Sequence, residues 1–246
     1  MRDFSTKRYW IIGASAGIGK AVSEQLSRQG ACVILSARSE DDLNELAATL
    51  PGKQEVVPMD IADAKSVAKA AETVGDVDGI VFLAGLYWPM TTQEWDAEKA
   101  VQMADVNFTG CVRVLGHVVP KMVARNEGHI VLTGSLAGFR GLPGAIGYGA
   151  SKAAVMSLAE SMRVDLADTG VEVQLVNPGF VKTRLTEKND FKMPFIMEPE
   201  QAAREIVEHM HDDSFAKSFP RGFASMFKAG RALPGWAWQR MARRAG

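Results

Sequence analysis

The sequence of 246 residues is 47% hydrophobic and carries a formal net charge of −1 at pH 7. This length suffices for one α/β domain with a full core, and the near-neutral charge argues against a general nucleic-acid-binding protein. Cys32 and Cys111 fall in apolar patterns, and the four histidines suggest no metal-ligand cluster. The sequence shows neither a secretory signal nor a run of 18 apolar residues. We therefore expect core cysteines, no metal site and a cytoplasmic protein.

The first pattern combines a strand, a glycine turn and a helix. A buried strand is predicted over Arg8–Gly13 and an amphipathic helix over Lys20–Gln29, with glycines between them. In this context glycines let the backbone approach a pyrophosphate, and the helix N-terminus offers free N–H groups. We favour a dinucleotide site over an ordinary turn, with candidate contacts at Gly13, Ser15, Gly17, Ile18 and Gly19.

The end of the second predicted strand, Ala31–Ser36, indicates which nicotinamide cofactor is used. A site for NAD usually has an acidic residue about 20 residues after the glycines, where it binds the ribose hydroxyls. This sequence has Ala37 there, followed by Arg38. A guanidinium suits the 2′-phosphate of NADP, so NADP(H) is the predicted cofactor. The alternative is that Arg38 is only a solvated surface residue.

Asp60 and Ile61 close the third predicted strand, Glu55–Met59, which follows a predicted helix over Glu40–Leu50. An aspartate at a strand end is well placed to contact the amino group of an adenine ring. It is equally suited to cap the next predicted helix, Ala64–Val74, and the sequence leaves both roles open.

A fourth strand, Gly79–Leu83, runs into Ala84 and Gly85, whose small side chains would let a cofactor lie against the backbone. A long helical pattern then covers Thr92–Asn126 and contains Asn107. Because a buried asparagine inside a helix needs hydrogen-bond partners, Asn107 is either part of a core network or a functional group.

Ser135, Tyr148 and Lys152 form the candidate catalytic group. Ser135 ends the fifth strand, His129–Ser135, and the other two lie four residues apart on a helix predicted over Ile146–Asp168. A free tyrosine has a pKa of about 10, and a nearby ammonium lowers it by stabilising the phenolate. Bringing that pKa near 7 requires roughly 4 kcal/mol. Tyr148 would then exchange a proton with a carbonyl or alcohol oxygen that Ser135 holds. The alternative is a pair of exposed helix neighbours.

The remaining pattern completes an α/β fold. A sixth strand is predicted over Val171–Val176, followed by Asn177-Pro178-Gly179, and a helix over Glu198–His211. Strands that are nearly continuously apolar and that alternate with helices indicate a parallel sheet covered on both faces. We expect residues 1–246 to form one domain, with a C-terminal helical extension over residues 220–246.

The sequence resembles the short-chain dehydrogenase/reductase family from about Lys7 to Phe219. The segment Gly13–Gly19 is similar to its cofactor motif, although Ile12 replaces the usual threonine. Phe82 and Leu83 replace the asparagines of its Asn-Asn-Ala-Gly segment. Arg38 matches a position that is basic in members that prefer NADP. The other matching positions are Asp60, Ala84, Gly85, Asn107, Ser135, Tyr148, Lys152, Pro178, Gly179 and Thr183.

This resemblance implies a Rossmann-type doubly wound sheet of seven parallel strands in the order 3-2-1-4-5-6-7. It also implies hydride transfer, with Tyr148 as acid/base and Ser135 polarising the carbonyl. Lys152 would hold the nicotinamide ribose and lower the pKa of the tyrosine, and Asn107 would anchor a proton-relaying water. Pro178, Gly179 and Thr183 would hold the nicotinamide amide. The alternatives are a protein that senses NADP(H) without turnover and an interaction protein that uses its tail.

Apolar residues dominate the expected substrate pocket, beneath a lid predicted over Thr183–Met197. Few charges lie nearby, namely Arg140, Lys182 and Arg184. The predicted substrate is therefore a lipophilic ketone or aldehyde, or the matching secondary alcohol. The alternative is that these side chains are core residues. The candidates are Trp88, Met90, Leu136, Phe139, Leu142, Phe180, Leu185, Met193, Phe195, Ile196 and Met197.

The last segment, Phe215–Gly246, is basic and aromatic. After Asp213 the sequence contains seven lysines and arginines and no acidic residue. The rest of the chain carries a net charge of −8. Short helices are predicted over Arg221–Leu233 and Trp236–Arg244. We favour packing of these helices on the chain's own substrate cleft or on a partner subunit over contact with an anionic membrane surface. A homo-oligomer that differs from the family's usual tetramer is expected.

Overall fold

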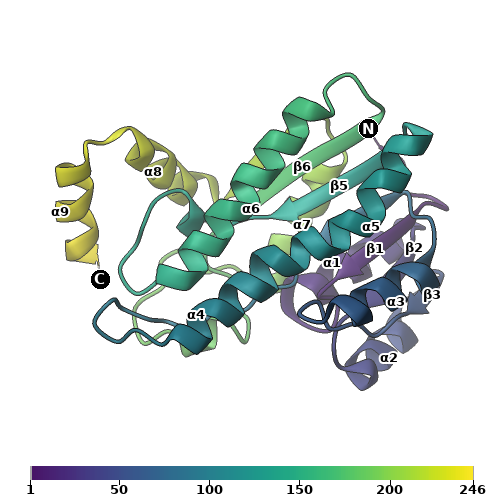
Figure 1. Cartoon of the computed structure of the whole chain (residues 1–246), viewed down its shortest axis with the longest axis horizontal. Coiled ribbons are helices and arrows are strands. Elements are labelled where there is room, and N and C mark those ends of the chain that lie inside the picture. The colour runs from purple at the N-terminus through teal and green to yellow at the C-terminus, as the bar shows by residue number, and fades with distance from the viewer. Residues whose placement is uncertain (1, 246) are drawn as a thin grey trace.

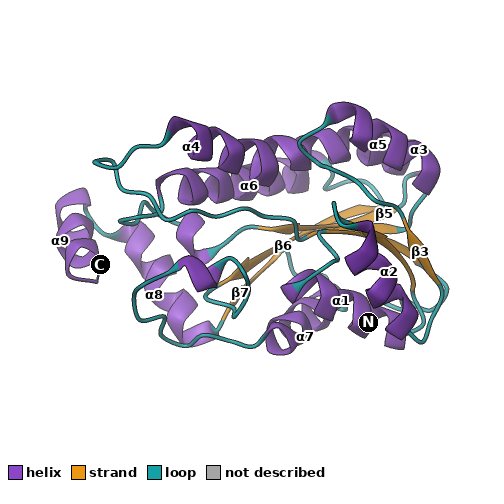
Figure 2. Ribbon diagram, turned by 90° about the horizontal axis from the view of Figure 1, so that it is seen from below, coloured by secondary structure: helices purple, strands orange, loops and turns teal. Residues whose placement is uncertain are grey.

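A computed structural model describes residues 2–245, and seven parallel strands in one sheet organise it. The strand order is β3-β2-β1-β4-β5-β6-β7, which confirms the predicted Rossmann-type topology. Figure 2 shows the sheet as a layer between two layers of helices. The strands are β1 (Arg8–Ile12), β2 (Cys32–Ser36), β3 (Gln54–Val56), β4 (Gly79–Phe82), β5 (Gly128–Thr133), β6 (Val171–Pro178) and β7 (Ala216–Phe219).

Each face of the sheet has its own apolar core. One core includes side chains of α3, α5 and α6, and the other includes side chains of α1, α2 and α7. Strands β4 and β5 are buried throughout, as expected for parallel strands covered on both faces. The helices are α1 (Gly17–Arg28), α2 (Glu40–Thr49), α3 (Ala64–Val74), α4 (Ala97–Ala104), α5 (Gly110–Arg125), α6 (Ile146–Asp165), α7 (Pro199–Met210), α8 (Arg221–Ala232) and α9 (Gly235–Ala245).

The register of the central strands places the candidate site at one edge of the sheet. Ile12 of β1 pairs with Phe82 of β4, which pairs with Leu132 of β5, which pairs with Leu175 of β6. The carboxyl ends of these strands therefore lie level. The loops that follow them carry the glycine turn, Ala84 and Gly85, Ser135 and Gly179. Ligands of open α/β sheets bind at this edge.

The single helix predicted over Thr92–Asn126 is wrong in detail. Asp96 caps α4 by accepting a hydrogen bond from the Lys99 amide at 3.0 Å, and residues 92–95 precede that helix. A wider π-helical turn over Asp105–Thr109 then separates α4 from α5. This turn contains Asn107, whose hydrogen bonds are described below. Within residues 2–245, no helix is long and apolar enough to cross a membrane.

Helices α8 and α9 extend the chain beyond the last strand. They follow β7 and lie at the end of the molecule opposite α2 and α3, close to the loop between β5 and α6 (Figure 1). Phe223 and Ala224 of α8 are buried against Leu136, which follows β5. The inner face of the extension thus packs on the chain's own candidate cleft.

Candidate active site

The glycines of the first turn serve the chain's own packing. A side chain at Gly13 would place its Cβ 2.7 Å from the Ala84 amide nitrogen, and one at Gly19 would lie 2.0 Å from the Gly13 carbonyl oxygen. These two glycines are therefore required for β1, β4 and α1 to meet, and their contact with a pyrophosphate stays a prediction. Gly17 has a positive φ of 53°, and its Cβ would lie 2.9 Å from the Thr183 methyl group.

The N-terminus of α1 fits a phosphate group. Ala16 stands at the N-cap, and in the described part of the chain no side chain caps this helix. The first amides of a helix lack intrahelical acceptors, so this end offers donors and the positive end of the helix dipole. Thr183 faces the same turn from the loop after β6. Ser15 and Ile18 flank it, and Ile18 also packs against the core.

Arg38 and Asp60 lie at the ends of β2 and β3. Arg38 is exposed, two residues beyond β2. The Asp60 carboxylate accepts a hydrogen bond from the Ala62 amide at 3.0 Å, and α3 is capped by Asp63. The helix-cap alternative for Asp60 is therefore wrong. Ile61, also a candidate cofactor contact, is buried and belongs to the core.

Ser135 is held in place by the turn that follows it. The side chain is 7% exposed, and its oxygen accepts a hydrogen bond from the Ala137 amide at 3.1 Å. That bond caps the short 3-10 turn Leu136–Gly138. Because a serine hydroxyl both donates and accepts, the accepted bond leaves the O–H available for another oxygen.

Tyr148 and Lys152 lie one turn apart at the start of α6, beside Ser135. The Lys152 Nζ is 5.8 Å from the centre of the Tyr148 ring and donates to the Thr133 carbonyl oxygen at 3.0 Å. Lys152 is only 3% exposed. Its ammonium therefore reaches the end of β5 through the interior, with two further N–H groups available. The structure thus brings the three predicted residues together.

The pKa values of Tyr148 and Lys152 within the chain differ from the prediction. Burial raises the pKa of Tyr148 to about 12, against the lowering effect of its hydrogen bond with Ser135. Burial also lowers the pKa of Lys152 to about 8. The predicted lowering of the tyrosine pKa by the lysine is not found here, because desolvation disfavours the charged form of both groups.

Asn107 connects three parts of the site. Its Oδ1 accepts a hydrogen bond from the Leu86 amide at 2.6 Å, and its Nδ2 donates to the Leu86 carbonyl and to the Ser151 hydroxyl, each at 2.9 Å. Ser151 in turn donates to the Tyr148 carbonyl at 2.8 Å. The π-helical turn thus directs Asn107 to the loop after β4 and to α6. A Cβ at Gly85 would lie 3.7 Å from both the Asn107 Oδ1 and the Lys152 Nζ.

The candidate substrate residues have several different surroundings. Leu136, Phe139 and Phe180 belong to one apolar cluster beside Ser135. Trp88 lies apart, on the loop after β4, where the Lys188 Nζ is 4.8 Å from its ring centre. Leu142 is half-buried, and its carbonyl accepts a hydrogen bond from the Ala145 amide at 3.4 Å. Met90 is buried, and Met197 packs on the core. These two residues therefore fit the alternative that some of the pocket candidates are core residues.

The expected lid is attached to the loop after β4. Tyr87 donates to Asn189 at 2.9 Å, and Lys188 donates to the Tyr87 carbonyl at 2.8 Å. The Tyr87 ring meets the Tyr148 ring edge-on, with centres 5.1 Å apart. Leu185 comes within 3.8 Å of the Cβ position of Gly85. The segment Thr183–Met197 therefore contacts Gly85 and also Tyr87, the residue whose ring packs against Tyr148.

Sequence reasoning missed three phenylalanines at the site. They are Phe191, in the loop before α7, and Phe223 and Phe227 of α8. Phe223 packs with Leu136, and Phe180 and Phe227 border the same cluster. The available signal was the four-residue spacing of Phe223 and Phe227, which places both rings on one helix face.

Comparison with known proteins identifies the family. Residues 7–193 match the family model described as short chain dehydrogenase. The chain belongs to this family. An uncharacterised oxidoreductase of Myxococcus xanthus is 34% identical over 251 residues, which cover 99% of each chain. A 3-oxoacyl-(acyl-carrier-protein) reductase of Thermotoga maritima is 35% identical over 190 residues, which cover 72% of this chain and 75% of the relative.

A solved short-chain dehydrogenase supports the same assignment. The enzyme from Sphingobium yanoikuyae in complex with NADPH has a TM-score of 0.83 and 25% sequence identity to this chain, over 91% of each. As a short-chain dehydrogenase, the chain is an oxidoreductase that binds a nicotinamide cofactor and a small-molecule substrate.

Proposed function

We propose that this short-chain dehydrogenase reduces a lipophilic ketone or aldehyde with NADPH, or oxidises the matching secondary alcohol with NADP+. The observation that carries the proposal is the meeting of Ser135, Tyr148 and Lys152 at the carboxyl end of β5, beside an apolar cluster. The hydroxyl groups of Ser135 and Tyr148, which can donate protons to a carbonyl oxygen, thus lie next to an apolar surface.

The catalytic steps assigned to the chain's own residues all act on the carbonyl oxygen of the substrate. Bound NADPH supplies the hydride that the carbonyl carbon receives. Ser135 donates its O–H to the carbonyl oxygen, which fixes the substrate and draws electrons from the carbon. Tyr148 gives its phenolic proton to the same oxygen, so the product is an alcohol. Lys152 would place its positive charge beside the phenolate that is left, which opposes the effect of burial on the pKa of Tyr148. In the oxidising direction the proton returns to Tyr148.

The three cations predicted near the pocket support an uncharged substrate, because each has a partner within the chain. Arg140 donates to the Leu233 carbonyl at 2.7 Å, Lys182 pairs with Glu198 at 3.4 Å, and Arg184 pairs with Asp42 at 3.6 Å. A carboxylate or phosphate on the substrate would have to displace one of these partners. The name of the Thermotoga relative describes reduction of a ketone on an acyl chain, which agrees with a lipophilic carbonyl.

Two observations support NADP(H) as the cofactor. Arg38 is an exposed cation just beyond β2, where an acid would favour NAD. The Sphingobium structure contains NADPH. The α1 N-terminus would hold the pyrophosphate, Asp60 the adenine, and Ala84, Gly85, Pro178, Gly179 and Thr183 would surround the nicotinamide half.

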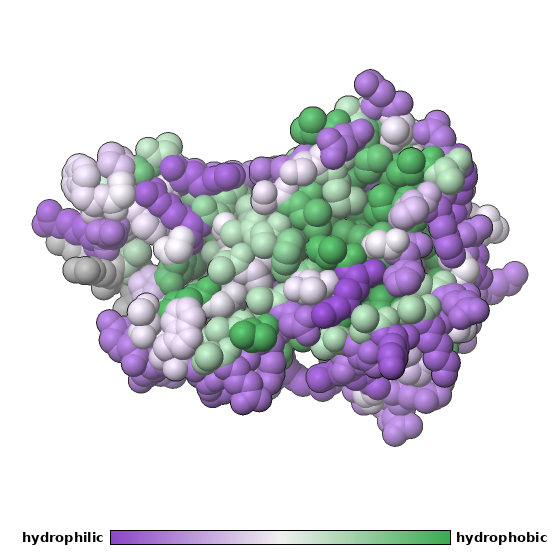
Figure 3. All heavy atoms as spheres, viewed as in Figure 1, coloured by the Kyte–Doolittle hydropathy of each residue, from purple (hydrophilic) through white to green (hydrophobic). Residues whose placement is uncertain are grey.

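A self-associated form is also part of the proposal. Four valines on α4, α5 and α6 are exposed by 42% or more. Figure 3 shows hydrophobic residues gathered over the middle of the view, where Figure 1 places α5 and α6. Apolar area of this kind is typical of a subunit interface. The valines are Val101, Val112, Val123 and Val164.

The test of the reaction is NADPH oxidation by the purified chain with carbonyls graded in chain length and polarity. We expect turnover that increases with the length of the apolar chain. A strong preference for small charged keto acids would contradict the substrate class. Absence of turnover with every carbonyl and every matching alcohol would favour the rival functions, an NADP(H) sensor or an interaction protein.

A further inference from the structure

Five phenylalanine rings form a continuous chain of contacts across three segments. Phe180 follows β6, Phe191 and Phe195 belong to the loop before α7, and Phe223 and Phe227 belong to α8. Ring centres are 5.9 Å apart for Phe180 and Phe191, 5.8 Å for Phe180 and Phe223, 5.7 Å for Phe195 and Phe223, and 5.0 Å for Phe223 and Phe227. We refer to these five residues as the phenylalanine cluster.

The inner end of the phenylalanine cluster contacts two residues next to the proposed reaction centre. A Cβ at Gly179 would lie 3.3 Å from the Phe223 ring and 3.2 Å from Leu136. Leu136 directly follows Ser135, and Gly179 belongs to the segment proposed to hold the nicotinamide. Phe223 is 9% exposed, whereas Phe195 is 66% exposed. The cluster thus extends from Leu136 and Gly179, beside the proposed reaction centre, to the protein surface.

A second set of contacts attaches the C-terminal helices to the loop between Ser135 and Tyr148. The Trp238 indole N–H of α9 donates to the Gly141 carbonyl at 2.8 Å. The Arg140 guanidinium lies 5.3 Å from the centre of the Trp238 ring and donates to the Gly230 and Leu233 carbonyls at the end of α8. One loop arginine therefore binds both helices.

Helices α8 and α9 also fit tightly against each other. A Cβ at Gly230 would lie 2.6 Å from the Trp238 ring, so only glycine permits this approach. Trp238 is 7% exposed, whereas Trp236, two residues earlier, is 72% exposed. The two tryptophans of α9 thus have different environments. Trp238 joins α8, α9 and the loop, and Trp236 faces away from them.

We propose that the phenylalanine cluster is a subsite for the hydrocarbon or aryl arm of the carbonyl substrate, and that Trp238 is a positioning residue that holds α8 in place. This inference rests on the proposed function. Aromatic rings bury an apolar arm well, and each buried methylene contributes about 0.8 kcal/mol, or about fourfold in kcat/KM. The C-terminal extension would then select the substrate while the reaction itself occurs on β5 and α6.

The first experiment compares straight-chain 2-ketones of increasing length. We expect kcat/KM of the wild-type chain to rise about fourfold per methylene over several carbons. Phe223→Ala should flatten this rise, so that its loss of kcat/KM relative to the wild type grows with each added methylene. Phe195→Ser alters an exposed ring and should reduce the rise only for the longest ketones. Met226→Ala is the matched control, because Met226 is 58% exposed on the same helix. An unchanged slope in both phenylalanine variants would overturn the subsite.

The second experiment tests Trp238 as a positioning residue. Trp238→Phe removes the N–H that binds Gly141 and keeps an aromatic ring. Amide hydrogen exchange in residues 139–144 should become at least tenfold faster. KM for long ketones should rise, with kcat for the shortest ketone and its pH profile unchanged. Trp236→Phe is the control and should alter none of these. Equal effects of the two substitutions, or unchanged exchange in Trp238→Phe, would overturn the role of Trp238.

A binding measurement separates failure of the subsite from failure of the proposed function. N-phenyl-1-naphthylamine is a neutral aryl fluorophore that needs no turnover. We expect it to bind the wild-type chain and Met226→Ala with equal affinity, and Phe223→Ala at least fivefold more weakly. If no carbonyl is reduced but this pattern holds, the proposed reaction is wrong and the apolar subsite stands. If Phe223→Ala binds the probe as well as the wild type, the subsite is wrong whatever the reaction.

Discussion

The Nζ of Lys152 donates a hydrogen bond to the Thr133 carbonyl oxygen at 3.0 Å and lies 5.8 Å from the centre of the Tyr148 ring. The ammonium is thus held in the interior, between the end of β5 and the phenol. Burial lowers the pKa of Lys152 from its ordinary value of 10.5 to about 8. The chain therefore places a charge where it destabilises the fold, next to the tyrosine that is proposed to react.

Replacing this lysine should stabilise the protein and abolish turnover. The unfolded chain binds the lysine proton more tightly than the folded chain, so burial of Lys152 lowers stability below pH 8, and this penalty is relieved between about pH 8 and 10.5. Lys152→Met should raise the free energy of unfolding at pH 7 by up to about 3 kcal/mol. Urea unfolding at pH 7 and pH 10 measures it. A variant less stable than the wild type at pH 7 would contradict the account. So would a difference in unfolding free energy between variant and wild type that is as large at pH 10 as at pH 7.

Much of the fold was predictable because its signals are local. Apolar strands alternating with amphipathic helices indicated a parallel sheet, and the family resemblance supplied its order. The four-residue spacing of Tyr148 and Lys152 placed both on one face of α6, as the structure shows. Asn107 was recognised as a buried amide that needs partners, although the π-helical turn that directs it was not.

The features that sequence reasoning missed depend on contacts between distant segments. The need for glycine at position 13 arises from Ala84, in the loop after the neighbouring strand β4. The raised pKa of Tyr148 follows from burial, which the spacing of Tyr148 and Lys152 does not reveal. Phe223 reaches Leu136 only because α8 folds back over the loop after β5. Such contacts follow from tertiary packing and have no local pattern.

Cofactor preference is expected to depend on Arg38. A charge-assisted hydrogen bond contributes roughly 1.5–3 kcal/mol, or about tenfold to a hundredfold. Arg38→Ala should lower kcat/KM for NADPH by that factor and leave kcat/KM for NADH unchanged. Arg28→Ala is the control, because its exposed pair with Glu24 at 3.4 Å contributes little. A wild-type chain that uses NADH as well as or better than NADPH would disprove the assignment.

Self-association is expected to use the exposed valines of α4, α5 and α6. The wild-type chain should sediment as a species heavier than the 26.6 kDa monomer. Val112→Lys, in an apolar interface, would bury an unpaired charge and should shift the protein to the monomer. Asn44→Lys adds the same charge on the exposed face of α2 and should not. The proposal fails if the wild-type chain is monomeric, or if both variants behave alike.

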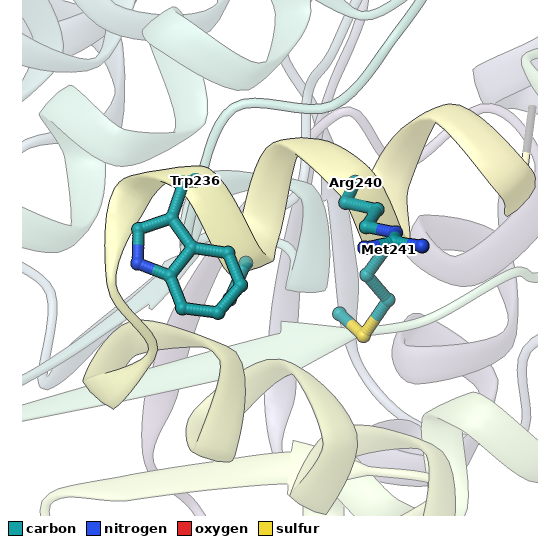
Figure 4. Close-up of a pocket in the computed structure, with 4 residues that line it drawn as sticks. Trp236, Arg240 and Met241 are labelled. Atoms are coloured by element: carbon teal, nitrogen blue, oxygen red, sulfur yellow. The ribbon is translucent and has the colours of Figure 1, made fainter.

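The outer face of α9 provides a test of membrane contact. Trp236, Arg240 and Met241 lie on this helix (Figure 4), and they are exposed. The opposite side, with Trp238, is used within the chain. Because the larger apolar faces of α8 and α9 are already packed, we expect the chain not to float with anionic liposomes. Flotation that weakens with salt and is lost in Trp236→Ser would instead support a bilayer-binding tail.

The central claim is that Tyr148 transfers the proton, and Tyr148→Phe tests it most directly. This variant keeps the ring, which meets Tyr87 at 5.1 Å, and removes only the transferable proton. The measurement is single-turnover oxidation of bound NADPH by the best ketone, together with the Kd for NADPH. We predict a fall in rate of about 10²- to 10⁴-fold with the Kd unchanged. A turnover rate near that of the wild type would remove Tyr148 from the mechanism.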